Sequence, residues 1–509
     1  MKVNAQTLEW INVFDVHSIG FGAGAVRPSS QIDTNGKITT VVVENDTLKL
    51  YQTLGSGVIV NSFSSNKMVN NNSTPLIKTT NNELSLVYKS GSFWLLQTDA
   101  DLNVTRNTSL TLPSGITSSS TVHHLIEYDD ELYLTVMGNG NHYLLKINNN
   151  NTLSVVYNSS LSGGYGEDYI LLDSGNIIFS YRNANNHIIR CVSIDNGILV
   201  WEQTINRNHG ILLKYRIAKN GNVLYAAGLE RAWVGGVADD ELAISHIDIN
   251  SGNILFQEPL ALPYCSGCFI GFENFVYNTS NDKLYITYVS GFPTPAVSIV
   301  ELNNISENVL QQTYFPISYD AILPQIDDYS RIYVKPNGQV VLLYKSYKNL
   351  TEKTNLYISP LDATLLSTDT LEINVGTLES VEHPSDVRIY DNSRILITGI
   401  IPNANPSIFW EQVNFFTTMV NLDDALSVTN PEENKVAITI YPNPANEIIT
   451  IITPENVKEL TVYSVLGKVM DKQKITQKEF TMNVSSYPAG IYFLTFSGSQ
   501  NIVKKLIVR

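Results

Sequence analysis

Short apolar runs, most of them rich in β-branched residues, alternate along the chain with turns rich in Asn, Asp and Gly. A two-residue turn between two such runs recurs eight times, with second positions spaced by 46, 48, 45, 46, 61, 56 and 54 residues. The turns are Asn35-Gly36, Asn81-Asn82, Asp129-Asp130, Ser174-Gly175, Asn220-Gly221, Asn281-Asp282, Asn337-Gly338 and Asp391-Asn392. Each follows a short predicted strand and precedes a stronger one, which indicates a modular all-β fold.

Each repeat has room for four short strands. In the third repeat, for example, the strands His142–Ile147 and Leu153–Tyr157 follow Glu131–Val136. Four strands in a period of about 40 to 50 residues are the signature of one blade of a β-propeller. The sequence therefore predicts an eight-bladed β-propeller over residues 7–428, with seven blades as the alternative if the first or last repeat is accessory.

The two ends of this region complement each other. The last repeat offers three clear strands, ending with Phe415–Leu422. At the other end, Leu8–Val13 resembles the fourth strand Leu199–Glu202 but has no blade before it. We predict that this N-terminal strand completes the last blade and closes the ring, because closure removes an exposed sheet edge.

The final stretch of the chain predicts a second, smaller all-β domain. Its apolar runs are Ala437–Ile440, Ile448–Ile452, Leu460–Val465, Ile491–Phe496 and Ile502–Val508. Runs of this length separated by Pro, Gly and Asn are typical of a small immunoglobulin-like β-sandwich. Pro442 and Pro444 cannot donate ladder hydrogen bonds and belong at a strand edge, while Gly467 and Gly490 fit turns. Residues 429–434 are the predicted linker and 435–509 the domain.

Four motifs follow one another in this domain. They are Tyr441-Pro442-Asn443-Pro444, the strand and turn Val462–Lys468, the segment Val484–Tyr492, and the terminal Lys504-Lys505-Leu506-Ile507-Val508-Arg509. Their order and spacing over residues 434–509 resemble the type A C-terminal sorting domain of the type IX secretion system. The resemblance implies recognition by the outer-membrane translocon and cleavage by a sortase-like peptidase, which can attach the passenger to surface lipopolysaccharide. It implies a protein that is secreted or held on the outer-membrane surface after passing through the periplasm. A generic immunoglobulin-like module is the alternative.

The first residues bear on this route. A type IX substrate needs a signal peptide, and residues 1–6 are too short to hold its hydrophobic region. Asn4-Ala5-Gln6 resembles the small-residue end of such a peptide, so we interpret residues 1–6 as its remnant. No apolar run approaches the roughly 18 residues of a transmembrane helix.

Two repeats carry a more specific resemblance. Asp195-Asn196-Gly197 leads into Ile198–Trp201, and Asp248–Gly252 leads into Asn253–Phe256. These segments resemble the repeat of pyrroloquinoline-quinone-type propellers, in which Asp and Gly shape the turn between the third and fourth strands and a Trp packs between blades. Only the first segment keeps the Trp, so the resemblance supports the fold and not the cofactor. We predict no cofactor.

Charge and cysteine content limit the classes of partner and of metal site that the sequence allows. The net charge is −15 and uneven: residues 434–509 carry nine Lys/Arg and five Asp/Glu, a net +4, which leaves −19 for the rest. An acidic main domain argues against nucleic acid as a partner. Cys265 and Cys268 are expected to form a local disulfide in an oxidising compartment, and Cys191 to be buried in its strand. A zinc site would need a second ligand pair, which is not evident, so we predict no metal.

Aromatic residues occur in the longer connections between second and third predicted strands. These connections are short in the first three repeats and longer later, at Leu229–Glu241, Ser290–Ala296, Lys345–Asn355 and Ile401–Asn414. The aromatic residues are Trp233, Phe292, Tyr347, Phe409 and Trp410. Exposed aromatics on loops suit stacking on sugar rings or anchoring a protein partner. The alternative is that they pack the loops onto the blades.

Polar and charged residues precede the first predicted strand of most repeats, where a propeller places its channel mouth. They are Arg27, His123, His124, Glu167, Asp168, His209, Glu273, Asp327, Asp328, Glu382 and His383. Carboxylates that converge with histidines could perform acid–base chemistry. Hydrated polar groups lining a channel are the alternative, since no short-range ligand spacing is present.

Three functions remain open from the sequence. The favoured one is a non-catalytic surface propeller that binds glycan or protein through the aromatic loops. The second is an enzyme at the channel mouth, either a polysaccharide-acting hydrolase or a quinone-dependent oxidoreductase. The oxidoreductase is disfavoured because no vicinal disulfide is present to stack a quinone. The third is a structural spacer at the cell surface.

Overall fold

The computed structural model places the chain in two compact units, Met1–Ser427 and Val428–Arg509. It describes residues 8–18, 28–44, 46–69, 73–160, 164–183, 186–205, 211–234, 237–260, 270–290, 296–303, 309–316, 330–349, 352–367, 370–373, 383–402, 412–422, 439–441, 443, 445–453, 457–464, 469–488, 490–498 and 502–508. Regular structure in these residues is β-strand throughout, which confirms the all-β prediction. No helix that could span a membrane occurs in this part of the chain.

Within its described residues, the first unit contains eight four-stranded antiparallel sheets, seven of them built from consecutive strands. Sheet 1 is β2 (Ser29–Ile32), β3 (Ile38–Glu44), β4 (Thr47–Thr53) and β5 (Ile59–Met68). Sheet 2 is β6 (Ile77–Lys78), β7 (Leu84–Ser90), β8 (Ser92–Thr98) and β9 (Val104–Ser109). Sheet 3 is β10 (Thr121–Tyr128), β11 (Glu131–Gly138), β12 (Asn141–Ile147) and β13 (Leu153–Ser160). Sheet 4 is β14 (Gly164–Asp173), β15 (Asn176–Asn183), β16 (Asn186–Ser193) and β17 (Leu199–Ile205).

The next three sheets repeat this order. Sheet 5 is β18 (Ile211–Asn220), β19 (Val223–Val234), β20 (Val237–Asp248) and β21 (Ile254–Leu260). Sheet 6 is β22 (Ile270–Asn278), β23 (Lys283–Ser290), β24 (Ala296–Asn303) and β25 (Val309–Pro316). Sheet 7 is β26 (Ser330–Val334), β27 (Val340–Asn349), β28 (Glu352–Pro360) and β29 (Leu371–Ile373).

Sheet 8 joins the two ends of the first unit. Its strands are β30 (His383–Ile389), β31 (Arg394–Pro402), β32 (Gln412–Asn421) and β1 (Leu8–Ser18), in the order β1-β32-β31-β30. Strand β1 pairs antiparallel with β32 from Leu8↔Val420 to Ser18↔Gln412. The predicted closure of the last repeat by the N-terminal strand is therefore confirmed.

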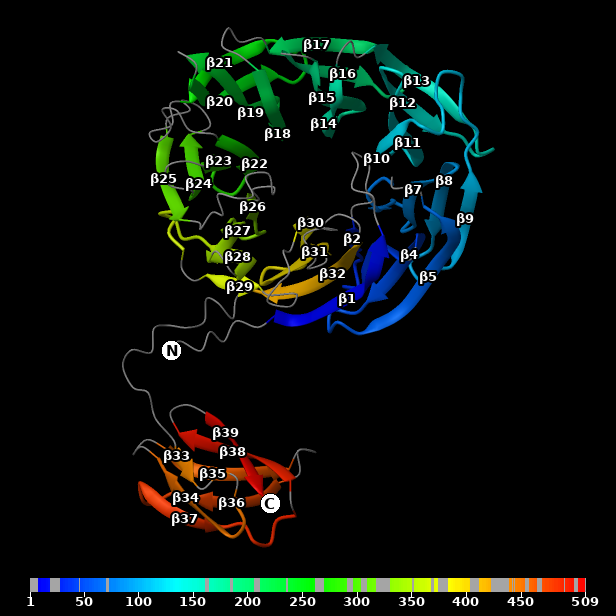
Figure 1. The fold of residues 1–509 in the computed structure, drawn as a ribbon. Helices are drawn as coiled ribbons and strands as arrows, with labels where there is room; N and C mark the ends of the chain where they lie inside the picture. Colours follow the sequence, from blue (N-terminus) through cyan, green and yellow to red (C-terminus); the bar gives the residue numbers. More distant parts are fainter. Residues whose placement is uncertain are drawn as a thin grey trace. The chain divides into compact units, whose positions relative to one another are not determined.

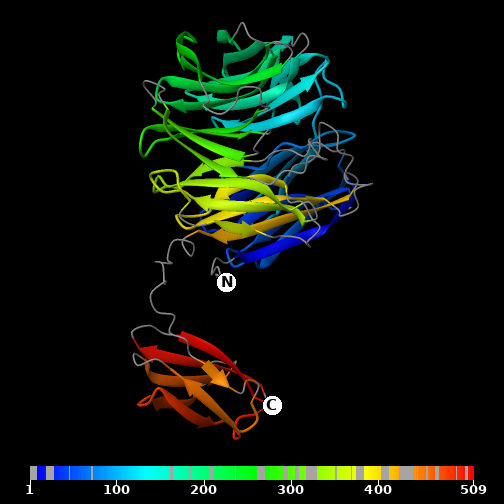
Figure 2. The same ribbon diagram turned by 60° about the vertical axis from the view of Figure 1, so that its left-hand side comes forward.

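The sheets stand around a common centre, with each first strand innermost and each fourth strand on the rim (Figure 1). The turned view shows the same sheets stacked side by side around the ring (Figure 2). Consecutive four-stranded antiparallel sheets closed by a strand from the other terminus make a β-propeller. In this topology the turns between first and second strands and between third and fourth strands share one face.

The core lies between neighbouring sheets, because each sheet buries apolar residues on both of its faces. Sheets 4 and 5, for example, enclose one cluster that includes Ile189, Trp201 and Leu224. Cys191 belongs to this cluster, as predicted, and burial raises the pKa of its thiol to about 12. A thiol held protonated in an apolar interface acts as a small hydrophobic residue.

Turns between third and fourth strands dock on the outer strand of the preceding sheet. Trp201 of β17 donates from Nε1 to the carbonyl oxygen of Ile249 at 2.8 Å, in the turn that precedes β21. A Cβ placed on Gly252 of that turn, which has φ +73°, would lie 2.7 Å from the Trp201 ring. The glycine therefore lets the indole approach the backbone closely. The resemblance of this repeat to those of pyrroloquinoline-quinone-type propellers implied such a tryptophan between neighbouring blades.

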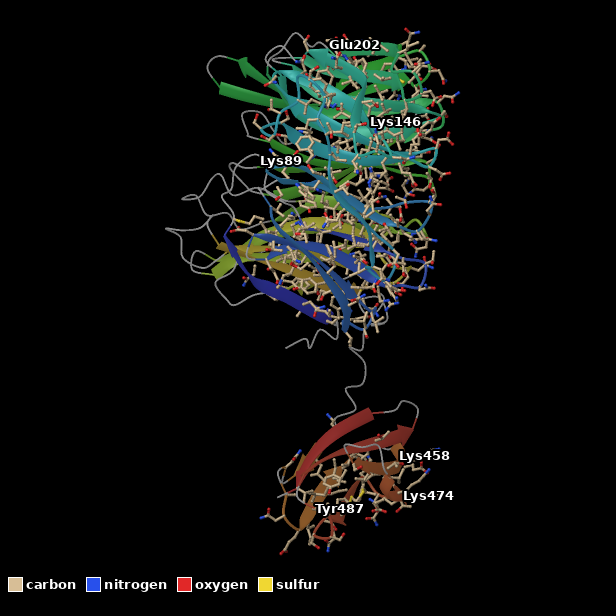
Figure 3. The ribbon with its side chains drawn as sticks, turned by 90° about the vertical axis from the view of Figure 1, so that its right-hand side faces the viewer. Lys89, Lys146, Glu202, Lys458, Lys474 and Tyr487 are labelled. Atoms are coloured by element: carbon tan, nitrogen blue, oxygen red, sulfur yellow. The ribbon has the colours of Figure 1, made fainter. Side chains whose placement is uncertain are left out.

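The second unit has two sheets around one core. The first has three strands, β33 (Thr439–Tyr441), β34 (Ile448–Ile452) and β37 (Glu479–Asn483), and the other four, β36 (Val469–Lys474), β35 (Val457–Ser464), β38 (Gly490–Gly498) and β39 (Ile502–Val508). Both sheets contribute to a cluster that includes Ile449, Leu494 and Leu506. Strands β36 and β37 were not predicted, because exposed polar residues such as Lys474 dominate their sequences. Lys458 and Lys474 are exposed on this unit (Figure 3).

Candidate functional site

The hairpin between the second and third strands of sheet 5 extends past its neighbours. Among the described residues, β18 pairs with β19 as far as Arg231, and β21 pairs with β20 as far as Leu242. The pairing of β19 with β20 continues to Val234↔Val237. Within the described residues, the end of this hairpin is therefore a two-stranded ribbon that extends past the paired parts of β18 and β21.

Sheet 7 has a similar projecting hairpin on the same face. Strand β26 reaches Tyr344 of β27, and β29 reaches Leu356 of β28. The pairing of β27 with β28 continues to Asn349↔Glu352. In sheets 1 to 3 the corresponding hairpins close tightly, as at Ser90↔Ser92. The hairpins of sheets 5 and 7 thus share the face on which the sequence placed the long connections, while residues 291–295 and 403–411 of the other two connections lie outside the described residues.

The predicted aromatic residues differ in where they fall. Trp233 lies in β19 opposite Ala238, and Tyr347 lies in β27 opposite Thr354. The expectation that both sit on irregular loops was wrong, because the ladders of β19 with β20 and of β27 with β28 continue past both positions as hairpins. Phe292, Phe409 and Trp410 lie outside the described residues.

A β-bulge recurs at the start of the first strand in five of the described sheets. At each of these bulges, one extra residue of the first strand opposes the second strand, and β14 has a further bulge between Tyr165 and Glu167. The bulges lie between Val122 and Leu125, Glu167 and Tyr169, Leu212 and Lys214, Phe272 and Asn274, and Pro384 and Asp386. A bulge bends its strand and redirects side chains, and is common at rims and next to binding sites. The innermost strands are thus reshaped at the same level around the channel.

Several predicted channel residues fall at these bulges. His123 and His124 occupy the one in β10, where the backbone N–H of His124 donates to Thr135 Oγ1 at 3.0 Å. Asp168 and Glu273 are the extra residues of β14 and β22. The sequence signal was a polar pair interrupting the alternation of an otherwise apolar strand.

The structure does not bring all predicted polar residues together. Glu167 and Asp168 belong to sheet 4, whereas His383 begins β30 of sheet 8 on the opposite side of the ring. Arg27, His209, Asp327, Asp328 and Glu382 lie outside the described residues, as do Cys265 and Cys268. Among the residues that are described, no group of three or more His, Cys, Asp or Glu is placed to hold a metal ion.

The structure also contains a buried Ser–His pair that the sequence analysis missed. Ser180 Oγ of β15 lies 2.7 Å from His187 Nε2 of β16, and both side chains are buried. Burial lowers the pKa of His187 to about 3, so the imidazole is neutral at physiological pH. A Ser beside a neutral His can act as a nucleophile in principle. Complete burial keeps substrate away from this pair, so its role is structural.

The motif residues of the second unit combine buried and exposed positions. The Tyr492 hydroxyl donates to the carbonyl oxygen of Pro488 at 2.7 Å, and its ring lies 5.1 Å from that of Tyr487. Tyr487 is labelled in Figure 3. Gly490 begins β38 and Tyr441 ends β33. Lys504 is exposed on β39, next to Lys505, and Asn443 is also exposed. Pro442, Pro444 and Gly467 lie outside the described residues.

Residues 439–509 match the family described as "Secretion system C-terminal sorting domain". The second unit is therefore a type IX secretion sorting domain, as its motifs indicated. Such a domain implies interaction with the type IX secretion machinery and export to the cell surface or the extracellular space.

The remaining comparisons are distant. No curated protein is significantly similar to this chain in sequence. The WD40 domain of SCAP from fission yeast is 10% identical, with 81% of this chain and 99% of that chain covered at a TM-score of 0.46. Quinohemoprotein alcohol dehydrogenase from Comamonas testosteroni is 8% identical, with 86% and 80% covered at 0.46.

PorZ of Porphyromonas gingivalis, described as an essential bacterial surface component of the type-IX secretion system, is 8% identical. The match covers 94% of this chain and 91% of the PorZ chain at a TM-score of 0.24. Similarity at this level carries no information about ligand or activity. The propeller architecture rests on the sheet topology of the chain itself.

Proposed function

We propose that this chain is a type IX secretion passenger whose eight-bladed propeller binds glycan or protein at the cell surface without catalysis. The observation that carries the proposal is the pair of hairpins projecting from sheets 5 and 7 on one face, with Trp233 and Tyr347 in their projecting parts. Aromatic residues on hydrogen-bonded two-stranded ribbons supply contact area at low entropic cost, which favours binding to sugar rings or protein surfaces. No cofactor is part of this proposal.

In this proposed function the C-terminal unit accounts for export. We propose that its two sheets form an immunoglobulin-like sandwich, which the translocon recognises and a sortase-like peptidase removes. The passenger is then released or attached to surface lipopolysaccharide. A disulfide between Cys265 and Cys268 forms in the oxidising compartment through which the chain passes.

A second candidate function is a hydrolase working at the channel mouth. The recurring bulges favour it, because they reshape the inner strands at Asp168 and Glu273. Hydrolysis of a polysaccharide by a pair of carboxyl groups would need them about 5 to 10 Å apart. Loss of hydrolysis in Asp168→Asn together with Glu273→Gln would support this candidate over simple binding.

A thermal-shift screen of the full chain against surface polysaccharides, with and without calcium, tests the binding function. A ligand that binds only the folded propeller raises its melting temperature by mass action. We expect the shift to vanish in a Trp233→Ala, Tyr347→Ala variant and to persist in Leu255→Ala, an exposed residue of the outer strand β21. A shift that survives the first variant would place binding elsewhere, and no shift with any polysaccharide would leave a protein partner or a spacer role.

A further inference from the structure

Strand β1 differs from the other fourth strands in its connection to the chain. Every other fourth strand comes directly after the third strand of its own sheet along the chain. Strand β1 pairs with β32, yet nearly the whole ring separates the two in sequence, and residues 19–27 link β1 forward to sheet 1. Its attachment to sheet 8 is thus entirely non-covalent.

The groove that β1 fills has two walls. One is the edge of β32, which pairs with β1 over its whole length. The other is the turn Leu54–Val58 of sheet 1, in which Leu54 N donates to Val58 O and Gly57 N donates to Leu54 O, both at 2.9 Å. Trp10 Nε1 donates to Gly55 O at 2.8 Å, and Asn12 Nδ2 donates to Gly57 O at 3.1 Å.

Trp10 and Asn12 are thus two anchors of β1 on sheet 1, and Phe14 is a third anchor at the same spacing. The ring of Phe14 is buried and stacks on Tyr51 of β4 with centroids 4.6 Å apart. Trp10, Asn12 and Phe14 therefore contact sheet 1 at every second position, which is the period of an extended strand. Val13, between two of the anchors, is 48% exposed.

The groove is shaped for this pattern of side chains. A Cβ on Gly57, which has φ +87°, would lie 2.5 Å from Trp10 Cγ, so the turn accepts the indole only because this position is glycine. Outside the anchors, the ion pair between Glu9 and Arg394, at 3.6 Å, fixes one end of the strand. Backbone pairing gives affinity and the alternate side chains give selectivity, as in other strand-addition sites.

We propose that this groove is a strand-binding site for extended segments of the pattern Trp-x-Asn-x-Phe, and that β1 of a second copy of this chain can occupy it by strand exchange. None of the contacts described involves residues 19–27, so a strand supplied by another copy would make the same contacts. Exchange of an identical element is a low-cost route to an oligomer. The second copy is the occupant because it carries the matching sequence. This inference is independent of binding at the projecting hairpins.

The experiment that tests the site folds the full chain before it is cut, so it does not depend on the folding of a truncated chain. A protease site is inserted within residues 19–27, the full chain is folded and then cut, and a fluorescent peptide of residues 8–18 is added. We expect the label to enter the cut protein as the original strand leaves. A Trp10→Ala peptide should bind at least about tenfold more weakly, since it loses a hydrogen bond and a half-buried ring. A Val13→Ala peptide, altered at the exposed position, should bind within about twofold of the parent.

A locked variant provides the matched control. Ser18 and Gln412 are directly paired, so Ser18→Cys together with Gln412→Cys should cross-link β1 to β32 and block uptake of the label. Equal labelling of locked and unlocked protein, or failure of the cut protein to take up any label, would overturn the proposal.

Mixing intact copies with and without an N-terminal tag tests the second-copy occupant. Mixed oligomers that the lock abolishes would support it, and their absence at high concentration would overturn it.

Discussion

The interfaces between sheets 4 and 5 and between sheets 8 and 1 use the same tryptophan contact with different chain connectivity. Trp201 and Trp10 each lie near the start of a fourth strand and donate to a carbonyl in the next sheet, at 2.8 Å in both cases. Each ring also covers a glycine with positive φ, Gly252 or Gly57. One strand continues from its own sheet, whereas the other arrives from the far end of the chain.

The closing interface also contains polar contacts. Ser30 Oγ lies 2.9 Å from Thr40 Oγ1 and 2.7 Å from Thr398 Oγ1, and Ser30 N donates to Asp386 Oδ2 at 2.9 Å. The Tyr390 hydroxyl donates to Gly36 O across the same interface. Buried hydroxyls that satisfy one another specify a single register. Hydrogen bonds of side chains thus help to fix sheet 1 against sheet 8.

The two tryptophans should therefore differ in energetic weight. Trp201 is 7% exposed inside an apolar cluster, so Trp201→Ala should lower the free energy of unfolding by about 3 to 5 kcal/mol. Trp10 is half-buried, and Trp10→Ala should cost about half as much because less apolar surface loses its cover. Urea unfolding of the full chain, monitored on the propeller transition, measures both. An equal or larger loss for Trp10 would mean that closure, and not burial, sets the cost.

The glycines beneath the rings sharpen the same comparison. Gly57→Ala and Gly252→Ala add both left-handed strain and a collision with an indole. Gly221 has φ +53° and open space where its Cβ would be, so Gly221→Ala isolates the strain, at about 1 to 2 kcal/mol. The two ring-facing substitutions should cost about 1 to 3 kcal/mol more than this control. Equal losses at all three positions, in the same urea experiment, would show that the rings move aside without cost.

Sequence periodicity predicted the parts of this architecture that depend on local pattern. The eight turns marked the first hairpin of each sheet, and the strand around Trp10 was recognised as an unpartnered fourth strand. The polar strands β36 and β37 were missed, because exposed polar residues dominate their sequences although Met470, Phe480 and Met482 pack on the core of the unit. The recurring bulges were also missed, since a polar pair such as His123-His124 marks the place but only the register between two strands shows that one residue is extra.

The candidate site was predicted less completely than the fold. The sequence located the long connections of sheets 5 and 7 but assigned Trp233 and Tyr347 to loops, because length alone does not distinguish a loop from a projecting hairpin. The Ser180–His187 pair carried no spacing signal, as the two residues meet only through the pairing of β15 with β16. Which inner-strand residues face one another across the ring depends on the order of whole sheets, which no local pattern contains.

Acid should weaken the ring where it buries a histidine. His187 has a folded pKa of about 3, below the ordinary value of 6.5, so the folded state binds fewer protons between these values. The stability that depends on a neutral His187 is complete above pH 6.5. As the pH falls from there toward 3, the free energy of unfolding decreases by about 1.4 kcal/mol per pH unit. From pH 6.5 to 5 we expect a loss of about 2 kcal/mol, measured by urea unfolding. His187→Gln should flatten this dependence, and an unchanged slope would assign the acid sensitivity to other groups.

The smallest effect belongs to the ion pair that ends the closing strand. Glu9 and Arg394 are about a quarter exposed, and a pair of this kind contributes about 0.2 to 1 kcal/mol. Glu9→Gln should therefore cost no more than this, and the cost should disappear in high salt because the pair is screened. Arg394→Ala is the contrasting variant, since Arg394 also pairs with Asp391 and lies over the Tyr390 ring, so it should cost more. If Glu9→Gln alone opened the ring, the charge would hold β1 in place. If it does not, selectivity for the closing strand resides in the alternating Trp10, Asn12 and Phe14 contacts.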